Sequence, residues 1–183
     1  MLQFVFPMLL SWWMFLIVPV VFLTATNETA FPSSQFYTLY DLYEATNGQN
    51  WYWKSNGKIW NFTDSNVNPC IDQWQGLVCL SSNTSISKIR LGEYNLVGTI
   101  PTSVASFVNL TTFNLTTNNL IGAIPSSLFD LQQLSSILLQ NNSLVEFENN
   151  SFPLLLSLTY LDLSDNLFTG PFMSFHNFLK KQV

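Results

Sequence analysis

The sequence predicts an α/β solenoid whose short parallel strands form a concave face and whose loops and short helical turns form a convex face. The first observation is a sequence phrase that repeats every 24 residues. Its four copies begin at Ile86, Leu110, Leu134 and Leu158. The second is a pair of apolar residues, two positions apart, in each phrase, which is typical of a short strand with one buried face. One phrase cannot cover its own apolar edge, so successive units must stack.

A third observation concerns the turn after each predicted strand. Asn118, Asn142 and Asn166 occupy the same place, three residues beyond the last strand leucine. A side-chain amide there can bond backbone groups that a turn leaves unpaired. Tyr94 takes this place in the first unit, so we expect the asparagine ladder to begin one repeat late.

Residues 110–125, LTTFNLTTNNLIGAIP, match the pattern LxxLxLxxNxLxGxIP almost completely. This pattern resembles leucine-rich repeats of the plant extracellular type, which implies a leucine-rich repeat solenoid over residues 86–183, with four units and an incomplete fifth. The third unit departs at Glu146, Glu148 and Asn149, and a literal overlay would bury the Glu148 carboxylate. A phrase similar to animal-type repeats avoids this burial by turning another set inward: Leu144, Phe147, Phe152 and Leu155.

We expect residues 31–85 to form an N-terminal cap, because a terminal solenoid unit would otherwise expose its apolar end to water. A helix is predicted from Ser33 to Gly48, with Ser33 or Ser34 capping its start and Asn47-Gly48 ending it. Its apolar face would comprise Phe36, Leu39, Tyr40 and Tyr43. The tryptophans that follow form a packed cap core or, as the less favoured interpretation, a carbohydrate-stacking site. They are Trp51, Trp53, Trp60 and Trp74.

The two cysteines of the chain are Cys70 and Cys79. Residues 70–79, CIDQWQGLVC, resemble the Cys-x-Trp-x-Gly-Val-x-Cys closing of the plant-type N-terminal cap, although the spacing here is longer. With a secretory address, the two thiols most simply form a disulfide that fixes the cap to the first strand. Free thiols or a zinc site are weaker interpretations, because a four-ligand zinc shell needs further cysteine or histidine nearby.

Residues 2–23 are almost entirely apolar, and no lysine or arginine precedes Lys54. We interpret residues 1–25 as a cleaved signal peptide or, as a second choice, an uncleaved N-terminal membrane anchor, since about 20 apolar residues span a bilayer. A buried core helix is the third interpretation. Either of the first two predicts repeats outside the cytosol, secreted or at the cell surface.

Seven Asn-x-Ser/Thr glycosylation sequons suit a protein of the secretory pathway. Asn114 lies between Phe113 and Leu115 on a predicted strand, where a glycan would obstruct the concave face. We therefore expect Asn114 to stay unmodified if that face binds a partner, and glycopeptide mass spectrometry would check its occupancy. The sequon asparagines are Asn27, Asn61, Asn83, Asn109, Asn114, Asn141 and Asn149.

Composition argues against two function classes. The formal net charge is −5, whereas nucleic-acid binding needs a basic surface. The single histidine, His176, lies beyond the last readable repeat, and no Ser-His-Asp or Cys-His arrangement is visible, so we predict no enzymatic activity. The neighbouring acids Asp162 with Asp165, and Glu146 with Glu148, fit exposed turns and offer too few oxygen ligands for calcium. Neither a metal nor a cofactor is expected.

The predicted concave face is the candidate ligand-binding surface. Three strand spacings of about 4.8 Å put Arg90 roughly 14 Å from Asp162, so a basic and an acidic end could orient an extended ligand. Leu138 and Tyr160 are the expected contact anchors. A merely solvated face is the alternative interpretation. The candidate residues are Lys88, Arg90, Glu93, Thr112, Thr116, Leu138, Gln140, Tyr160, Asp162 and Asp165.

The resemblance implies a non-enzymatic extracellular recognition module, similar to the N-terminal ectodomain of a receptor-like protein. The implied partners are extracellular proteins or peptides, another repeat ectodomain among them. Two alternatives stand beside it: a secreted inhibitor of wall-degrading enzymes, and a glycosylated structural protein of the matrix. Fold analogy carries this ranking, because the same repeats host many functions.

Overall fold

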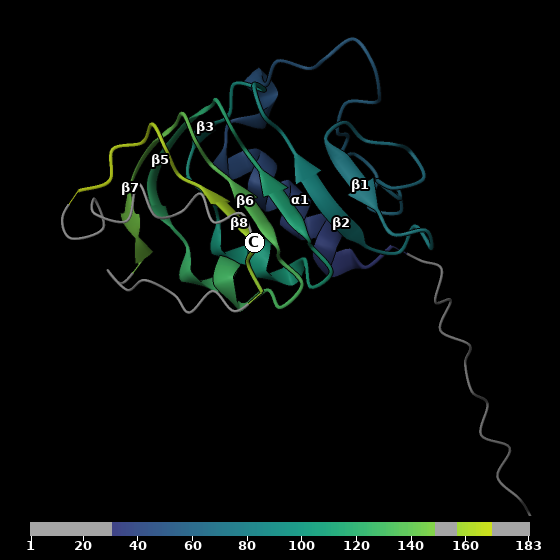
Figure 1. Ribbon diagram of the computed structural model, residues 1–183. Helices are drawn as coiled ribbons and strands as arrows, with labels where there is room; N and C mark the ends of the chain where they lie inside the picture. Colours follow the sequence, from purple (N-terminus) through teal and green to yellow (C-terminus); the bar gives the residue numbers. More distant parts are fainter. Residues whose placement is uncertain (1–30, 149–156, 170–183) are drawn as a thin grey trace, which may run out of the picture.

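The computed structural model, which describes residues 31–148 and 157–169, coils the chain so that successive repeats lie side by side (Figure 1). One parallel strand from each repeat joins the main sheet, and the short β1 pairs with β2 in the antiparallel sense. The parallel pairings join residues 24 positions apart, such as Lys88 with Thr112, so the predicted solenoid is confirmed. In spatial order the strands are β1 (Leu77–Cys79), β2 (Ile86–Arg90), β4 (Thr112–Asn114), β6 (Ser136–Leu138) and β8 (Tyr160–Asp162).

A second parallel sheet lies beside the main one, with one strand from each of three coils (Figure 1). Its strands are β3 (Val97–Gly98), β5 (Asn119–Ile124) and β7 (Ser143–Phe147). From the sequence, only loops and short helical turns were expected after the main strands. The helical turns are present as η2 (Thr102–Ser106) and η3 (Ser126–Asp130), but the second sheet was missed. It forms because extended segments on stacked coils meet and pair their backbone groups.

A continuous apolar core runs between the two sheets through every described coil. The second residue of each predicted strand pair is buried in all four units, and so is the first. The loop leucines also turn inward, which closes each coil over its neighbour. The buried strand residues are Ile89, Leu91, Phe113, Leu115, Ile137, Leu139, Leu161 and Leu163, and the loop residues are Leu96, Leu120, Leu144 and Phe168.

The predicted asparagine ladder is present and links each coil to the one before it. Asn118 Oδ1 accepts hydrogen bonds from the backbone N–H groups of Tyr94 and Leu96, at 3.1 and 3.0 Å. Its Nδ2 donates to the carbonyl oxygen of Leu91 at 2.8 Å. Asn142 and Asn166 repeat this pattern in the next coils. The ladder therefore begins at the second unit, as expected from Tyr94 in the first.

A second ladder, made of hydroxyl groups, lies at the other end of the main strands. Thr111 Oγ1 donates to the carbonyl oxygen of Ser87 at 2.9 Å, and Ser135 Oγ donates to that of Thr111 at 3.1 Å. Thr159 Oγ1 continues the series to Ser135 at 3.0 Å. The recurrence of Ser or Thr at this place was visible in the sequence and was not interpreted.

The predicted cap helix is α1 (Ser33–Ala45), and its start differs from the prediction. Pro32 occupies the N-cap position and no side chain caps the helix, so neither Ser33 nor Ser34 has the predicted capping role. A proline is tolerated there because the first N–H groups of a helix lack partners within it. Asn47 adopts a left-handed conformation after the helix, as predicted, with φ of 58°.

The buried face of α1 is also rotated relative to the prediction. Phe36 and Leu39 are buried as expected, but Leu42 completes the stripe, while Tyr40 remains 42 % exposed. Gln35 is buried as well, because its amide bonds Ser85 Oγ and the backbone N–H of Ile86, at 3.0 Å each. These bonds join the helix to the first repeat.

The tryptophans form a packed cap core. Trp51, Trp60 and Trp74 are at most 4 % exposed, and the rings of Trp60 and Trp74 stack at 5.8 Å. The indole N–H of Trp51 donates to the carbonyl oxygen of Thr46, and that of Trp60 to the carbonyl oxygen of Gln75. Burial with satisfied indole donors favours the core interpretation over a carbohydrate-stacking site.

The irregular third unit follows the animal-type phrase at the positions that the structure describes. Leu144 and Phe147 are buried, whereas Phe152 and Leu155 lie outside the described residues. Glu148 is half-buried, and its Oε2 accepts hydrogen bonds from the N–H and hydroxyl of Ser126 at 2.9 and 3.0 Å. The carboxylate thus gains the partners that burial requires.

Candidate binding surface

The outward side chains of the main sheet form straight rows across the strands. Each row joins residues that occupy the same place in successive coils, so a ligand lying across the strands meets one coil after another. Arg90 and Asp162 stand at opposite ends of one row, three strands apart. The first row is Lys88, Thr112, Ser136 and Tyr160, and the second is Arg90, Asn114, Leu138 and Asp162.

Positive charge is concentrated at the β2 end of this surface. Among the described cations, Lys54 and Lys58 have carboxylate partners, whereas Lys88 and Arg90 have no ion pair. Arg90 is exposed and Lys88 is half-buried. In a chain with net charge −5, two adjacent cations without ion-pair partners offer a local site for an anionic group.

Several other candidate residues already bond one another. Thr116 Oγ1 donates to Gln140 Oε1 at 3.0 Å across neighbouring coils. Asp162 Oδ1 accepts from the hydroxyl and N–H of Ser164 at 2.6 and 3.1 Å. These bonds hold the polar side chains of the surface in place. Leu138 and Tyr160 are half-buried on it, and Asp165 is exposed beyond the strand end.

Lys54 is a residue of this surface that the sequence analysis missed. Its Nζ donates to the carbonyl oxygen of Glu93 at 3.0 Å, lies 3.9 Å from the Glu93 carboxylate, and sits 5.1 Å from the ring centroid of Tyr94. The Tyr94 ring beside this lysine is buried, and its burial raises the pKa of the phenol hydroxyl. The predicted contact residue Glu93 therefore has a cap cation beside it, and no local sequence signal could have paired residues 39 positions apart.

Val78 is a second residue that the prediction omitted. It lies on β1 opposite Lys88 and is 40 % exposed, so it extends the first row toward the cap. The sequence did carry a signal for Val78, because the residue next to Leu77 in an alternating strand should face the opposite side of the sheet.

The described sequons fall on different surfaces. Asn61 and Asn83 are exposed in cap loops, and Asn141 is exposed in the turn after β6. Asn109 and Asn114 are half-buried: Asn109 Nδ2 donates to Ser85 Oγ, and Asn114 Oδ1 accepts from the N–H of Thr116, both at 3.0 Å. Asn114 lies in the second row, where it was predicted. Asn27 and Asn149 lie outside the described residues.

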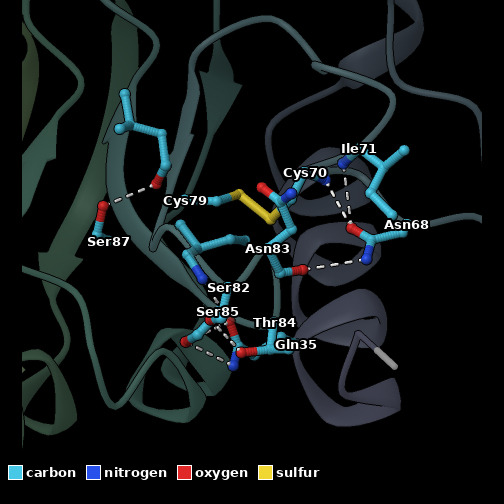
Figure 2. The surroundings of a disulfide bond; sticks show 12 residues. Gln35, Asn68, Cys70, Ile71, Cys79, Ser82, Asn83, Thr84, Ser85 and Ser87 are labelled. Carbon is cyan, nitrogen blue, oxygen red and sulfur yellow. Dashed lines mark hydrogen bonds between the residues drawn. A yellow bond between two sulfur atoms is a disulfide. The ribbon is translucent and has the colours of Figure 1, made fainter. Parts of the chain in front are cut away.

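Cys70 and Cys79 form a disulfide, as Figure 2 shows. Cys79 belongs to β1 and Cys70 to the loop before it, so the bond closes the cap upon its own strand. Hydrogen bonding of β1 to β2 then connects the cap to the repeats. Asn68 reinforces the loop, because its Oδ1 accepts from the N–H of Cys70 and its Nδ2 donates to the carbonyl oxygen of Asn83 (Figure 2).

Residues 31–148 and 157–169 contain no group of three acidic, histidine or cysteine side chains placed to hold a metal ion. His176 lies outside these ranges. The same ranges contain no helix of the length and apolarity needed to cross a bilayer. The predicted leader, residues 1–25, is not among the described residues.

The comparisons with known proteins agree with this geometry. No family model matches the chain. A probable leucine-rich repeat receptor-like protein kinase of Arabidopsis thaliana is 30 % identical over 89 residues, which cover 44 % of this chain and 9 % of the kinase. A chain in the BIR3–SERK2 complex of Arabidopsis thaliana superposes with a TM-score of 0.61 and 25 % identity, covering 81 % of this chain and 77 % of that one.

The chain therefore has the leucine-rich repeat fold and is similar to plant extracellular leucine-rich repeat proteins. Two further solved structures share its fold. A chain in the crystal structure of PEPR1–AtPEP1 superposes with a TM-score of 0.59 and 22 % identity, covering 79 % of this chain and 20 % of that chain. A plant ice-binding protein has a TM-score of 0.59 at 23 % identity, over 76 % of this chain and 42 % of that chain. The leucine-rich repeat chain spans only 9 % of the length of the curated kinase.

Proposed function

We propose that this leucine-rich repeat protein is a non-enzymatic extracellular recognition module that binds an extracellular protein or peptide across its concave face. The observation that carries the proposal is the pair of in-register rows, with Lys88 and Arg90 at one end and Leu138 and Tyr160 further along. An extended ligand with an acidic group would pair with the cations, and an apolar or aromatic group would rest on the anchors.

The proposed site of action is outside the cell, secreted or at the cell surface. The Cys70–Cys79 disulfide supports an oxidising compartment, and the exposed sequons Asn61, Asn83 and Asn141 suit a secretory route. Interpretation of residues 1–25 as a signal peptide or anchor is part of the same proposal. The BIR3–SERK2 complex contains a chain of similar fold engaged with a partner protein, which supports a protein or another repeat ectodomain as the partner class here.

The test is a pull-down of secreted plant proteins and peptides by the purified chain and by a double variant, Arg90→Glu with Tyr160→Ala. The variant should lose about tenfold or more of the recovered partner, because it removes one charge and one aromatic contact from the two rows. The control is Lys58→Glu with Tyr52→Ala, which also reverses one positive charge and removes one exposed tyrosine ring, but at cap positions outside the two rows.

Circular dichroism of all three proteins should show the same fold. Equal recovery of every partner by the concave-face variant and by the control variant would reject the concave-face proposal. Recovery of a wall-degrading enzyme, lost in the same variant, would instead identify the inhibitor alternative.

A further inference from the structure

The outer face of the second sheet carries an exposed aliphatic stripe formed by Val97, Ile121 and Val145. These residues are 41 %, 52 % and 37 % exposed, and they occupy the same place in three successive coils. The register pairs Val97 with Asn119 and Ile121 with Ser143, so the stripe crosses the strands obliquely. The three exposed side chains thus lie at equivalent places on adjacent strands of one sheet.

Acidic residues flank both ends of the stripe. At the β3 end, the N–H groups of Val97 and Thr99 donate to the carbonyl oxygens of Thr46 and Ala45, so the end of α1 lies against that strand, and the exposed Glu44 directly precedes Ala45. At the β7 end, the exposed Glu146 directly follows Val145.

The described cations do not balance these two acids. Lys54 and Lys58 pair with Glu93 and Asp72, and the remaining two lie on β2 in the main sheet. The stripe is thus an apolar centre with an acidic rim.

The described sequons leave this face uncovered. Asn61 and Asn83 lie in cap loops, Asn109 in the loop before β4, and Asn114 and Asn141 on or beside the main sheet. None lies on β3, β5 or β7. Glycans at the exposed sequons of the cap loops would shield the cap and leave the stripe open to a partner.

We propose that the stripe is the docking surface for a second extracellular protein whose contact surface has an apolar centre and a basic rim. Charge complementarity selects this partner over a second copy of the chain. A twofold axis through Ile121 would bring Glu146 of each copy toward Glu44 of the other, and like charges across an interface repel. The stripe is separate from the concave face, so failure of either proposal leaves the other standing.

The sequence contains two cysteines, Cys70 and Cys79, and they form a disulfide. An introduced cysteine is therefore the one free thiol available for labelling. Ile121→Cys introduces one labelling site, to which benzophenone-maleimide is attached. The purified secreted protein is irradiated in extracellular fluid from plant tissue, and mass spectrometry identifies the cross-linked peptide. Val108→Cys, at a 61 % exposed aliphatic residue in the loop before β4, is the matched control.

We expect the label at position 121 to cross-link a different protein through a peptide in which Lys or Arg flank apolar residues. Adding Glu44→Lys and Glu146→Lys should lower this yield about fivefold or more, because the acidic rim is reversed. Asp64→Lys with Asp130→Lys changes net charge equally at exposed sites elsewhere and should leave the yield unchanged. Adducts with the chain itself, the same yield in both charge variants, or no adduct at position 121 would each overturn the proposal.

Discussion

At the scale of single residues, the side chain of Asn142 bonds three backbone groups that belong to two successive coils. Its Oδ1 accepts from the N–H of Leu120 at 3.0 Å, and its Nδ2 donates to the carbonyl oxygens of Leu115 and Leu139 at 3.0 and 3.1 Å. Asn142 is 8 % exposed, so water cannot replace these bonds freely. An asparagine suits the site because it carries both a donor and an acceptor on one planar group.

We predict that Asn142→Ala lowers the free energy of unfolding by about 2–4 kcal/mol, because buried backbone groups lose their partners. Asn119→Ala is the matched control, since Asn119 is exposed and bonds only Asn95 through its side chain. It should cost no more than about 0.5 kcal/mol. Urea titration followed by tryptophan fluorescence measures both values. Similar losses in the two variants would mean that the ladder contributes little to stability.

At the scale of elements, the end of α1 meets the second sheet at Gly98. The carbonyl oxygens of Ala45 and Thr46 accept the N–H groups of Thr99 and Val97, so the helix covers the edge of β3. A Cβ added at Gly98 would lie 2.1 Å from the carbonyl oxygen of Ala45, and the φ of 132° is one that other residues rarely adopt. Only glycine lets this joint close.

Gly98→Ala should therefore reduce stability by about 3 kcal/mol or more, since backbone atoms on both sides must separate. Gly92→Ala provides the comparison, because its added Cβ would meet its nearest neighbour at 3.4 Å, an ordinary contact, without the unusual φ. That variant should fall within about 1 kcal/mol of the wild type. Thermal unfolding monitored by circular dichroism distinguishes them. A Gly98→Ala protein as stable as Gly92→Ala would show that the joint is not rigid.

At the scale of the whole molecule, the fold is a linear stack in which each coil depends on its neighbours. The first repeat is covered by β1 on the main sheet, by Gln35 of α1 at its start, and by the α1 end at β3. Removal of this cap would expose the buried side chains of the first coil, such as Leu91 and Leu96. Repeat arrays need a terminal unit with a polar outer face for this reason.

We predict that a chain beginning at residue 84 will not fold, although it retains every repeat. Its far-ultraviolet circular dichroism should lack the strand signal of the full chain, and heating should give no cooperative transition. The full chain, with the cap present, is the control. A cooperative transition in the shortened protein would show that the repeats are stable without the cap.

Most features set by local sequence were predicted correctly, whereas several features set by contacts between distant segments were not. Local periodicity identified the inward residues, the asparagine ladder and the left-handed Asn47, because these depend on neighbours in sequence or on strict repetition. It failed for the N-cap of α1, where Pro32 begins the helix without a side-chain bond. It also failed for Leu42, because which helix face is buried depends on the surface that the helix meets.

The candidate surface divides in the same way. The two rows on the main sheet could be predicted, since identical spacing places corresponding residues in register. The pairing of Lys54 with Glu93 could not, because a cap loop brings the two together across 39 positions. The exposed stripe on the second sheet was also missed, because the extended segments after the turns were interpreted as loops.

The sequence by itself determined the repeating coil, its parallel main sheet and the inward residues, because a 24-residue period forces each unit to bury the same places against the next. Tertiary structure alone decided how the cap closes on the first coil, which side chains of α1 are buried, and which of the cations in residues 31–148 lack a carboxylate partner. Those outcomes depend on contacts between distant segments, whose geometry no local pattern specifies.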